Sequence, residues 1–418
     1  MTQNDEADNL RAQTLFADGH YAEAAEIFRM LAAAVPQDPN PPYNCGVALA
    51  KLGRFEEALG FYRTAITLNP AFANAYVNFA FCLSELGLIA QARQGFAIAR
   101  SLAPDDPVPM LNESIAALAL GDYAVGWQSF SARWRIPGYD RFRRSFDKPD
   151  WRGENLNGKV LFLYAEQGFG DSLQMARYLP VLVAQAARVI VGVPPALAGL
   201  MRGIPGITVI VLGDTVPDFD FHAALMDIPA AMGTSVETIP ADVPYLHADA
   251  ARIDFYRQRL PDAATRRIGL AWAGRSTHGN DHNRSLALAQ LAPLFRLRNV
   301  SWVSLQKLVP DRDKEALRDS GMMDWGQEFA DFADAAAAVS ALDLVITVDS
   351  AMAHLAGSLG KDVWVLLPFS ADWRWMIGRT DSPWYPTARL FRQDRRGDWA
   401  AVIGRVAAEL GSFSSRLR

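Results

Sequence analysis

The sequence has few cysteines, no long hydrophobic run and no excess of positive charge. Its 418 residues include 2 cysteines, Cys45 and Cys82, too few for a disulfide framework and typical of a reducing compartment. No apolar run approaches the roughly 20 residues of a membrane-spanning helix, and the polar start MTQNDEADNL lacks the pattern of a secretory signal. A net charge of -5 gives no overall positive field for nucleic acid. We expect a cytoplasmic protein with no transmembrane segment and no nucleic-acid partner.

A repeat of 34 residues fills the first third of the chain. It is marked by glycines, small residues, aromatic residues and prolines that recur in one register: Gly19, Gly53, Gly87 and Gly121; Ala24, Ala58, Ala92 and Gly126; Phe28, Tyr62, Phe96 and Phe130; Pro36, Pro70 and Pro104. Small residues let two helices approach closely, the aromatic ring fills the space to the next hairpin, and proline stops the second helix. The pattern resembles an array of about four tetratricopeptide repeats (TPR) over residues 7–142.

One polar position recurs within these repeats. Asn44, Asn78 and Asn112 are 34 residues apart, and the first unit has Leu10 there. In the repeat geometry this position lies on the inner wall of the superhelix, where an amide offers one acceptor and two donors to a peptide backbone. The register resembles the asparagine ladder with which O-GlcNAc transferases grip extended polypeptide. The alternative is that asparagine is merely tolerated on a helix surface.

Beyond the repeats, residues 143–158 form a charged, turn-rich linker or strap, and the pattern then alternates between strands and helices. The strand candidates include KVLFLYA and ARVIVGV within residues 159–255, and RIGLAWAG, LDLVITVD and DVWVLLP within residues 266–397. A last helix is expected over residues 398–418. We therefore predict an α-solenoid followed by two doubly wound α/β halves, in which ligands bind at the carboxyl ends of the strands.

The first candidate loop, EQGFGD, follows the first of these strands. Gly168 and Gly170 permit close backbone approach, and the helix that follows favours anions at its N-terminus. Asp171 is either a cap of this helix or a catalytic base.

The second candidate loop is the polar stretch GRSTHGNDHNRS, residues 274–285. Arg275 and Arg284 in it favour phosphate contact over a metal site, because the spacing of His278, Asp281 and His282 matches no zinc pattern.

The third candidate, VDSAMAH, ends a buried strand and begins a helix. With Ser350 as N-cap, the backbone N–H groups of residues such as Ala351 and Met352 form an anion seat for a diphosphate. His354, one turn further on, is placed to donate to the same anion, although a lone histidine on an alanine-rich helix is often just packed. We expect an open, electropositive pocket over residues 350–354 that faces Asp171.

The fourth candidate lies between residues 368 and 393, where tryptophans and arginines interleave. Trp373 and Arg374 are typical of residues that line the base and phosphates of one nucleotide. The alternative is that the tryptophans simply pack.

Two of these motifs resemble one enzyme family. The segment VITVDSAMAHLAGSLGKDVWVLLP is similar to the donor-binding region of GT-B glycosyltransferases of the lipopolysaccharide heptosyltransferase type, and EQGFGD is similar to their Gly-Asp loop. With the repeats in front, residues 7–410 resemble bacterial TPR-fused glycosyltransferases, distant relatives of the O-GlcNAc transferases. The resemblance implies an acceptor-side half over residues 159–255 and a donor-side half over residues 266–397.

The implied reaction is the transfer of a sugar from a nucleotide sugar to a hydroxyl group, inverting and without a metal or other cofactor. Asp171 would accept the hydroxyl proton, while Ser350, His354 and Arg284 would stabilise the departing diphosphate. Asp349 would shape the turn, and Gln306 and Lys307 would contact ribose or phosphate. The repeats favour a protein or peptide acceptor.

Three other interpretations remain open at this point. The chain is a catalytically silent TPR scaffold with a vestigial α/β part, or a transferase that acts on a cell-surface glycan, or a transferase whose donor is a nucleoside monophosphate carrying an acidic sugar.

Overall fold

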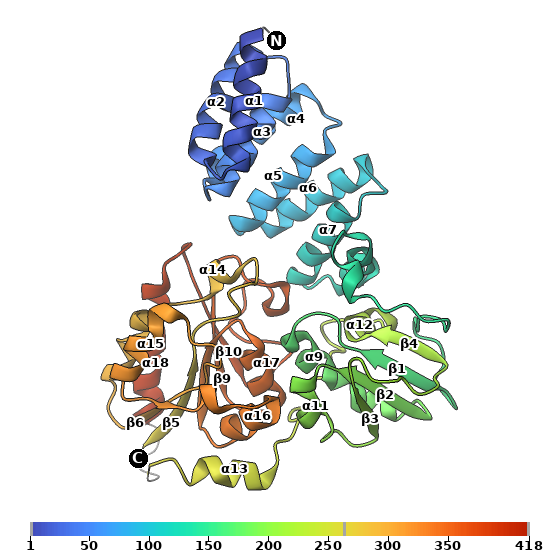
Figure 1. Cartoon of the computed structure of the whole chain (residues 1–418), viewed down its shortest axis with the longest axis vertical. Coiled ribbons are helices and arrows are strands. Elements are labelled where there is room, and N and C mark those ends of the chain that lie inside the picture. The colour runs from blue at the N-terminus through green and yellow to red at the C-terminus, as the bar shows by residue number, and fades with distance from the viewer. Residues whose placement is uncertain (1–2, 262–264, 416–418) are drawn as a thin grey trace. The chain divides into compact units, whose positions relative to one another are not determined.

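The computed structural model describes residues 3–261 and 265–415. The chain divides into two compact units, a helical repeat unit that ends at Asp140 and an α/β unit that begins at Arg141 (Figure 1). In the described part of the chain, no helix combines the length and the apolar character needed to cross a membrane.

The repeat unit consists of four helical hairpins. Its helices are α1 (Gln3–Ala17), α2 (Tyr21–Ala34), α3 (Asn40–Lys51), α4 (Phe55–Leu68), α5 (Ala73–Glu85), α6 (Ile89–Leu102), α7 (Pro107–Ala119) and α8 (Tyr123–Phe130). The recurring glycines lie between the two helices of each hairpin and have positive φ, from 74° to 86°. Only glycine adopts this conformation without steric cost, which explains their spacing.

The small residues of the repeat lie where helices meet. Ala24, Ala58 and Ala92 are fully buried, and a Cβ atom added at Gly126 would lie 2.5 Å from a methyl group of Leu118. The aromatic Tyr62 packs against Gly46, where a Cβ atom would lie 2.7 Å from its ring. The sequence prediction of tightly packed hairpins is therefore confirmed.

Both cysteines belong to the core of the repeat unit. Cys45 and Cys82 are fully buried and unpaired, and the thiol of Cys45 contacts the carbonyl oxygen of Ala25 at 3.4 Å. Burial raises the pKa of Cys45 to about 11 and that of Cys82 to about 12.

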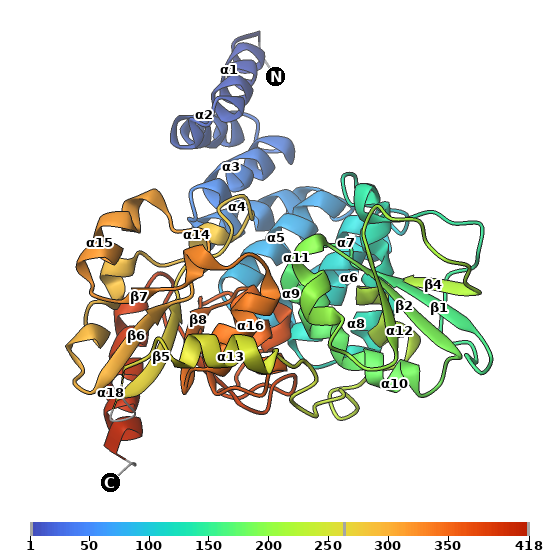
Figure 2. The same cartoon turned by 60° about the horizontal axis from the view of Figure 1, so that its bottom comes forward.

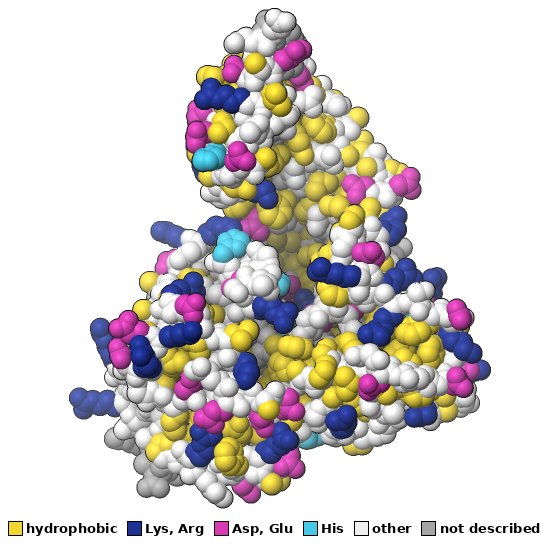
Figure 3. Space-filling model, viewed as in Figure 1, with side chains coloured by type: hydrophobic (Ala, Val, Ile, Leu, Met, Phe, Trp, Pro, Cys, Tyr) yellow, Lys and Arg dark blue, Asp and Glu magenta, His cyan; other side chains and the backbone are white. Residues whose placement is uncertain are grey.

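The three recurring asparagines lie half-buried on α3, α5 and α7, the first helices of their hairpins. The Nδ2 atom of Asn78 donates a hydrogen bond of 3.0 Å to the hydroxyl of Tyr43 in the preceding repeat. Hydrophobic side chains are visible over parts of the repeat unit in Figure 3. The exposed large ones in this unit include Leu10, Met30, Phe81 and Ile115.

The charged segment 143–158 packs as a strap along the first α/β half. The backbone N–H of Trp151 donates to the carbonyl of His222 at 2.7 Å. The ring of Phe146 lies 5.5 Å from that of Phe162 in the central strand. The strap thus covers the edge of the first half instead of hanging free.

The first α/β half has a four-stranded parallel sheet in the order β3-β2-β1-β4. Its strands are β1 (Val160–Tyr164), β2 (Arg188–Val193), β3 (Ile207–Val211) and β4 (Phe221–Ala224), and its helices are α9 (Phe169–Met175), α10 (Leu179–Val183), α11 (Pro195–Met201) and α12 (Ile228–Ala231). The order reverses between β1 and β4, so this is the position where doubly wound sheets bind ligands.

The second half has a six-stranded parallel sheet in the order β10-β9-β8-β5-β6-β7. Its strands are β5 (Arg266–Ala271), β6 (Val300–Ser304), β7 (Met323–Asp324), β8 (Leu344–Val348), β9 (Val363–Leu367) and β10 (Ala388–Arg392). Its helices are α13 (Ala250–Arg257), α14 (Asp281–Arg284), α15 (Lys314–Asp319), α16 (Phe332–Ser340), α17 (Ala351–Ser358) and α18 (Trp399–Ser415). The order reverses between β8 and β5, as in a dinucleotide-binding sheet.

The two halves pack directly on each other. Helix α11 of the first half lies beside α16 of the second (Figures 1 and 2), and α9 contacts α17. The fold is thus a TPR-like solenoid followed by an α/β region of parallel sheets, as the sequence pattern predicts.

Candidate functional site

The four segments singled out in the sequence meet at the carboxyl ends of the strands, the fourth through Arg374, which contacts Asp171. Helix α9 follows β1, the loop of residues 274–285 follows β5, and α17 follows β8. A Cβ atom added at Gly170 would lie 2.7 Å from Cδ2 of His354 and 3.6 Å from the Cα of Ala351. Gly170 is therefore a point where α9 and α17 approach closely, and a larger residue would separate them.

Asp171 occupies the first turn of α9. Its Oδ2 atom accepts a hydrogen bond of 2.8 Å from the backbone N–H of Gly168, the N-cap residue. Its Oδ1 atom accepts from Nη2 of Arg374. Both oxygens of this carboxylate therefore have partners, one from its own helix and one from the second half of the fold.

Arg374 joins the two halves through its guanidinium group. It lies in the short helix η9 (Trp373–Trp375) after β9, and its Nε atom donates to Oε1 of Gln174 at 2.8 Å. Its Nη1 atom donates to Oδ1 of Asp372 at 2.8 Å. With 12% of its side chain exposed, this cation is held by three partners, and such pairing offsets the cost of burying its charge.

The amino end of α17 has the geometry predicted from the sequence. Ser350 is the N-cap, and its hydroxyl oxygen accepts a hydrogen bond of 3.3 Å from the backbone N–H of Met352. Ser350, Ala351 and Met352 are partly exposed. The first turn of this helix is therefore accessible, with its dipole favouring a negative charge.

Asp349 lies directly before this helix and is largely buried. Burial, and then the charge of nearby Asp372, raise the pKa of Asp349 to about 6, while Arg284 and Arg374 act in the opposite direction. The side chain is thus an acid that titrates near neutral pH beside the helix end.

His354 is 4% exposed and held on several sides. Its ring stacks on Trp375 with centroids 5.4 Å apart and an interplanar angle of 23°, and its Nδ1 atom lies 2.8 Å from the hydroxyl of Tyr385. Burial, and then the charges of Arg374, Arg177 and Arg284, lower the pKa of His354 well below its usual value. The imidazole is therefore neutral at physiological pH.

Arg284 is positioned by Gly274, where a Cβ atom would lie 2.7 Å from its Nη2 atom. Its Nε atom lies 3.5 Å from Oδ1 of Asp281, and 15% of its side chain is exposed. Its charge acts on both Asp349 and His354. The loop after β5 thus places the positive charge of Arg284 near the amino end of α17.

The prediction of an open pocket over residues 350–354 needs a correction. The segment does lie against α9, the helix that carries Asp171. However, His354 is enclosed by Trp375, Tyr385 and the backbone of Gly170, and Arg374 already neutralises Asp171. The protein's own side chains therefore fill part of the space that the sequence suggested was free.

Other predicted residues have structural partners. The amide of Gln306 bonds to the backbone N–H groups of Trp272 and Ala273 and to the carbonyl groups of Ala273 and Leu308. Lys307 donates to the carbonyl groups of Gln327 and Phe329. We therefore leave Gln306 and Lys307 out of the site.

Two further predicted residues are Trp373 and Arg275. Trp373 is 4% exposed and packs edge-on against Trp384, which favours the interpretation that this tryptophan is a packed residue over the one that it lines a nucleotide. Arg275 lies exposed on the loop after β5.

Four residues where the two α/β halves meet were not predicted from the sequence. Gln174 and Arg177, in and just after α9, are buried, and so are Tyr245 and Tyr385. The sequence signal was a charged or amide side chain at every third position, Asp171, Gln174 and Arg177, in a segment that is mostly apolar. Such spacing marks one face of a helix, and polar residues on a buried face require specific partners.

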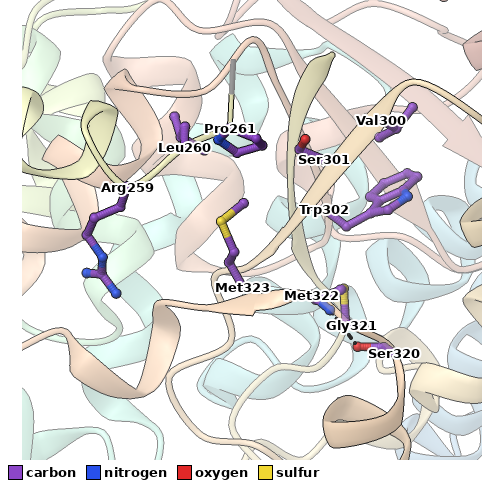
Figure 4. A pocket seen from close by; sticks show the side chains of 10 residues that line it. All are labelled: Arg259, Leu260, Pro261, Val300, Ser301, Trp302, Ser320, Gly321, Met322 and Met323. Carbon is purple, nitrogen blue, oxygen red and sulfur yellow. Dashed lines mark hydrogen bonds between the residues drawn. The ribbon is translucent and has the colours of Figure 1, made fainter. Parts of the chain in front are cut away.

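A separate pocket lies at the opposite edge of the second sheet (Figure 4). It is lined by Arg259, Leu260, Pro261, Val300, Ser301, Trp302, Ser320, Gly321, Met322 and Met323. Because it includes the first residues of β6, it lies toward the amino ends of the strands, away from the converging loops. Over the described residues, no group of three or more His, Cys, Asp or Glu side chains is arranged to hold a metal ion.

Comparison with known proteins identifies the repeats first. A tetratricopeptide repeat family model matches residues 49–109, so the chain contains such repeats. Protein FlbA of Caulobacter vibrioides is similar over nearly the whole chain, with 27% identity over 424 residues, 94% of this chain and 70% of that protein.

Two solved structures are similar to the repeat region. The second TPR domain of human RPAP3, in complex with an HSP70 peptide, is 25% identical, with a TM-score of 0.26 over 26% of this chain and 91% of that one. The type III secretion chaperone SycD of Yersinia enterocolitica, in complex with a YopD peptide, is 20% identical, with a TM-score of 0.25 over 26% of this chain and 82% of that one.

Proposed function

We propose that the chain is a glycosyltransferase of the GT-B type, which transfers a sugar from a nucleotide sugar to a hydroxyl group of a protein held by the repeats. The observation that supports this proposal is the ion pair between Asp171 of one half and Arg374 of the other. It lies where α9 contacts α17, the helix whose N-cap is Ser350.

The chemistry assigned to these groups is a single displacement at the sugar carbon. The acceptor oxygen forms a bond to that carbon and loses its proton to Asp171, while the bond between the carbon and the diphosphate oxygen breaks. The electron pair leaves with the diphosphate, whose negative charge is stabilised by Arg284, Arg374 and the N-terminus of α17.

This mechanism requires an exchange of partners. In the structure the Oδ1 atom of Asp171 accepts a hydrogen bond from the guanidinium group of Arg374, so this oxygen is already occupied. A bound diphosphate competes for the same guanidinium and thereby releases one carboxylate oxygen toward the acceptor. The ion pair is accordingly the resting state of the proposed base.

A panel of nucleoside mono- and diphosphates tests the proposal in a thermal-shift assay, followed by intact-mass analysis of candidate acceptor proteins with the matching nucleotide sugar. We expect stabilisation by one class of nucleotide and a mass increase of one sugar. Replacing Asp171 with Asn should abolish transfer and leave nucleotide affinity within a few-fold. If the Asp171→Asn variant turned over as fast as the wild type, Asp171 would not be the catalytic base.

The second candidate function is a TPR adaptor whose α/β unit is catalytically silent. The observation that favours it is that both oxygens of Asp171 already have partners, from Gly168 and Arg374. It predicts that no nucleotide in the panel stabilises the chain, while binding of a protein partner depends on the repeat unit.

A further inference from the structure

A second position recurs in the repeats, three residues after each asparagine. It is occupied by Val47, Phe81 and Ile115, which are 34 residues apart and lie on α3, α5 and α7, the helices that also carry the asparagines. Residues three apart share one face of a helix, so each of these helices presents an amide beside an apolar side chain. We call this surface the amide–apolar face; its members are Asn44, Val47, Asn78, Phe81, Asn112 and Ile115.

The apolar members of this face are more exposed in the later repeats. Val47 is partly buried, whereas Phe81 is 46% exposed and Ile115 is 37% exposed. In the first repeat the two residue types exchange places, with the exposed Leu10 at the asparagine position and the exposed Gln13 at the apolar one. Because α3, α5 and α7 follow one another along the stack of hairpins (Figure 2), amides and apolar groups recur side by side along the unit.

Charge is scarce on the helices that carry this face. The charged residues of α3, α5 and α7 are Lys51, Glu85 and Glu113. Glu113 is buried and lies 2.9 Å from Nε of Arg100 on α6, while Lys51 and Glu85 are the last residues of their helices. The second helices differ, since they carry Glu26 and Arg29 on α2, Glu57 and Arg63 on α4, and Arg93 and Arg100 on α6. The scarcity of charge is therefore a property of this face and not of the whole repeat unit.

The chemistry of the face restricts what can bind there. A charged segment would lose water without gaining an opposite charge, which costs free energy. An asparagine amide has both donors and an acceptor, and these match the backbone N–H and C=O groups of an extended chain. A bound helix would not use them, because it pairs its backbone groups internally. Exposed apolar side chains beside the amides favour a partner whose side chains are apolar as well.

We propose that the amide–apolar face binds an extended, uncharged segment of a partner protein, with its backbone against the asparagines and its apolar side chains against Phe81 and Ile115. Such a segment is the class of acceptor that the repeats select. Its role as acceptor rests on the proposed function, whereas its binding to the face does not.

Fluorescence anisotropy of the full chain with three pools of labelled, carboxyl-amidated peptides tests this selectivity. The peptides consist of serine and glycine with a few alternate positions randomised: valine, leucine, isoleucine or phenylalanine in the neutral pool, aspartate or glutamate in the acidic pool, and lysine or arginine in the basic pool. We expect the neutral pool to bind about 10-fold more tightly than either charged pool. Equally tight binding of a charged pool would overturn the proposal. So would a neutral pool that does not bind, and in that case the nucleotide panel still decides the transferase function separately.

A matched pair of double variants locates the binding. Phe81→Ser together with Ile115→Ser should weaken binding of the neutral pool by about 10-fold, because two apolar contacts are lost. Ile98→Ser together with Leu102→Ser removes side chains of similar exposure, 43% and 39%, from α6, and should leave binding unchanged. An equal loss in both double variants would show that the peptides do not bind the amide–apolar face.

Added charge should reverse the selectivity. With Phe81→Lys and Ile115→Lys in one chain, we expect the acidic pool to bind most tightly, because the face then supplies the opposite charge. If the neutral pool is still preferred, the lack of charge on this face does not set the selectivity, and the proposal fails.

A second copy of the chain and a lipid surface are the other occupants that an exposed apolar face could have. Sedimentation equilibrium tests the first, and flotation with phosphatidylcholine vesicles tests the second. We expect the wild type and the Phe81→Ser, Ile115→Ser variant to have the same mass and neither to float. If the wild type self-associates or floats and the variant does not, that occupant covers the face and the proposal is wrong.

Discussion

At the scale of single residues, the candidate site is a set of carboxylates that already have cations beside them. Asp171 and Asp372 share Arg374, and Asp281 accompanies Arg284. Removing charges from water costs free energy that good pairing offsets. A phosphate ligand must therefore compete with these carboxylates for the same guanidinium groups, and the affinity of the site depends on how many of them are ionised.

Asp349 is the carboxylate whose ionisation should change within an accessible pH range. Its pKa is raised to about 6 by burial and by Asp372, so it is charged at pH 7.5 and neutral at pH 5. We expect Asp349→Asn to bind pyrophosphate several-fold more tightly than the wild type at pH 7.5, since one nearby negative charge is lost. Isothermal titration calorimetry at both pH values measures the ratio of the two affinities.

At pH 5 that ratio should approach one, because Asp349 is then protonated in the wild type as well. Taking the ratio cancels the titration of pyrophosphate itself. A ratio that does not change with pH would show that Asp349 does not act on the anion seat.

The same group links stability to pH. Its folded pKa, about 6, is above the ordinary value of 3.8, so the folded chain binds more protons than the unfolded chain between these values. The contribution of Asp349 to the free energy of unfolding should therefore decrease as the pH rises from 4 to 6. Urea denaturation at several pH values should show that the free energy of unfolding of the wild type falls relative to that of Asp349→Asn over this range, and a constant difference would contradict the assignment.

At the scale of secondary-structure elements, the junction of the two halves depends on the contact between α9 and α17. Gly170 provides the space for His354 there. Gly170→Ala should force the helices apart, with a cost of about 1 to 3 kcal/mol in the free energy of unfolding. Because all of the 11 tryptophans except Trp127 and Trp134 belong to the α/β unit, urea denaturation followed by tryptophan fluorescence reports mainly on this unit.

The matched control is Gly404→Ala in α18. Gly404 is exposed, and a Cβ atom there would meet nothing within 4 Å. Alanine has a higher helix propensity than glycine, so the free energy of unfolding of this variant should rise by up to about 1 kcal/mol. Opposite signs for the two substitutions would support the contact between α9 and α17, whereas a stabilised Gly170→Ala variant would contradict it.

Arg177 connects three segments that lie far apart in the sequence. Its replacement by Met leaves the carbonyl groups of Pro240 and Trp384 without their donor. Buried carbonyls without a donor are costly, and we expect a loss of about 2 kcal/mol in the free energy of unfolding. Arg188→Met, which removes an exposed contact to Thr208, should change the free energy of unfolding by less than about 0.5 kcal/mol. Equal effects in the same denaturation assay would refute a special role for Arg177.

Much of the fold could be predicted from the sequence, because the patterns of its helices and strands depend on residues that are close together in the chain. The glycines at 34-residue spacing need positive φ, and the run of apolar residues in β8 is fully buried. The partners of polar residues could not be predicted in the same way. Gln306 follows a strand as a ligand-binding residue would, yet its amide bonds to the backbone after β5, a contact that depends on the tertiary structure.

At the scale of the whole molecule, the proposed function divides the work between the two units. The repeat unit carries the asparagines and the α/β unit carries the anion seat. Replacing Asn44, Asn78 and Asn112 together with Ala should raise the KM for a protein acceptor and leave nucleotide-induced thermal stabilisation unchanged, because the three amides belong to the repeat unit and the anion seat belongs to the α/β unit. Steady-state transfer assays and thermal shifts on the same preparation measure both quantities.

The control for this triple variant is the removal of two amides from a second helix of the same unit. Gln91 and Gln94 are exposed on α6, and their replacement with Ala should leave KM unchanged. An equal rise in KM for both variants would show that the effect does not come from the asparagine position.

The burial of Cys45 and Cys82 has a practical consequence. Thiols with pKa values of about 11 and about 12 remain protonated at neutral pH and are out of reach of solvent, whereas maleimide reagents react with exposed thiolates. A cysteine introduced at any surface position should therefore take up a fluorophore or spin label selectively, without replacement of either native residue.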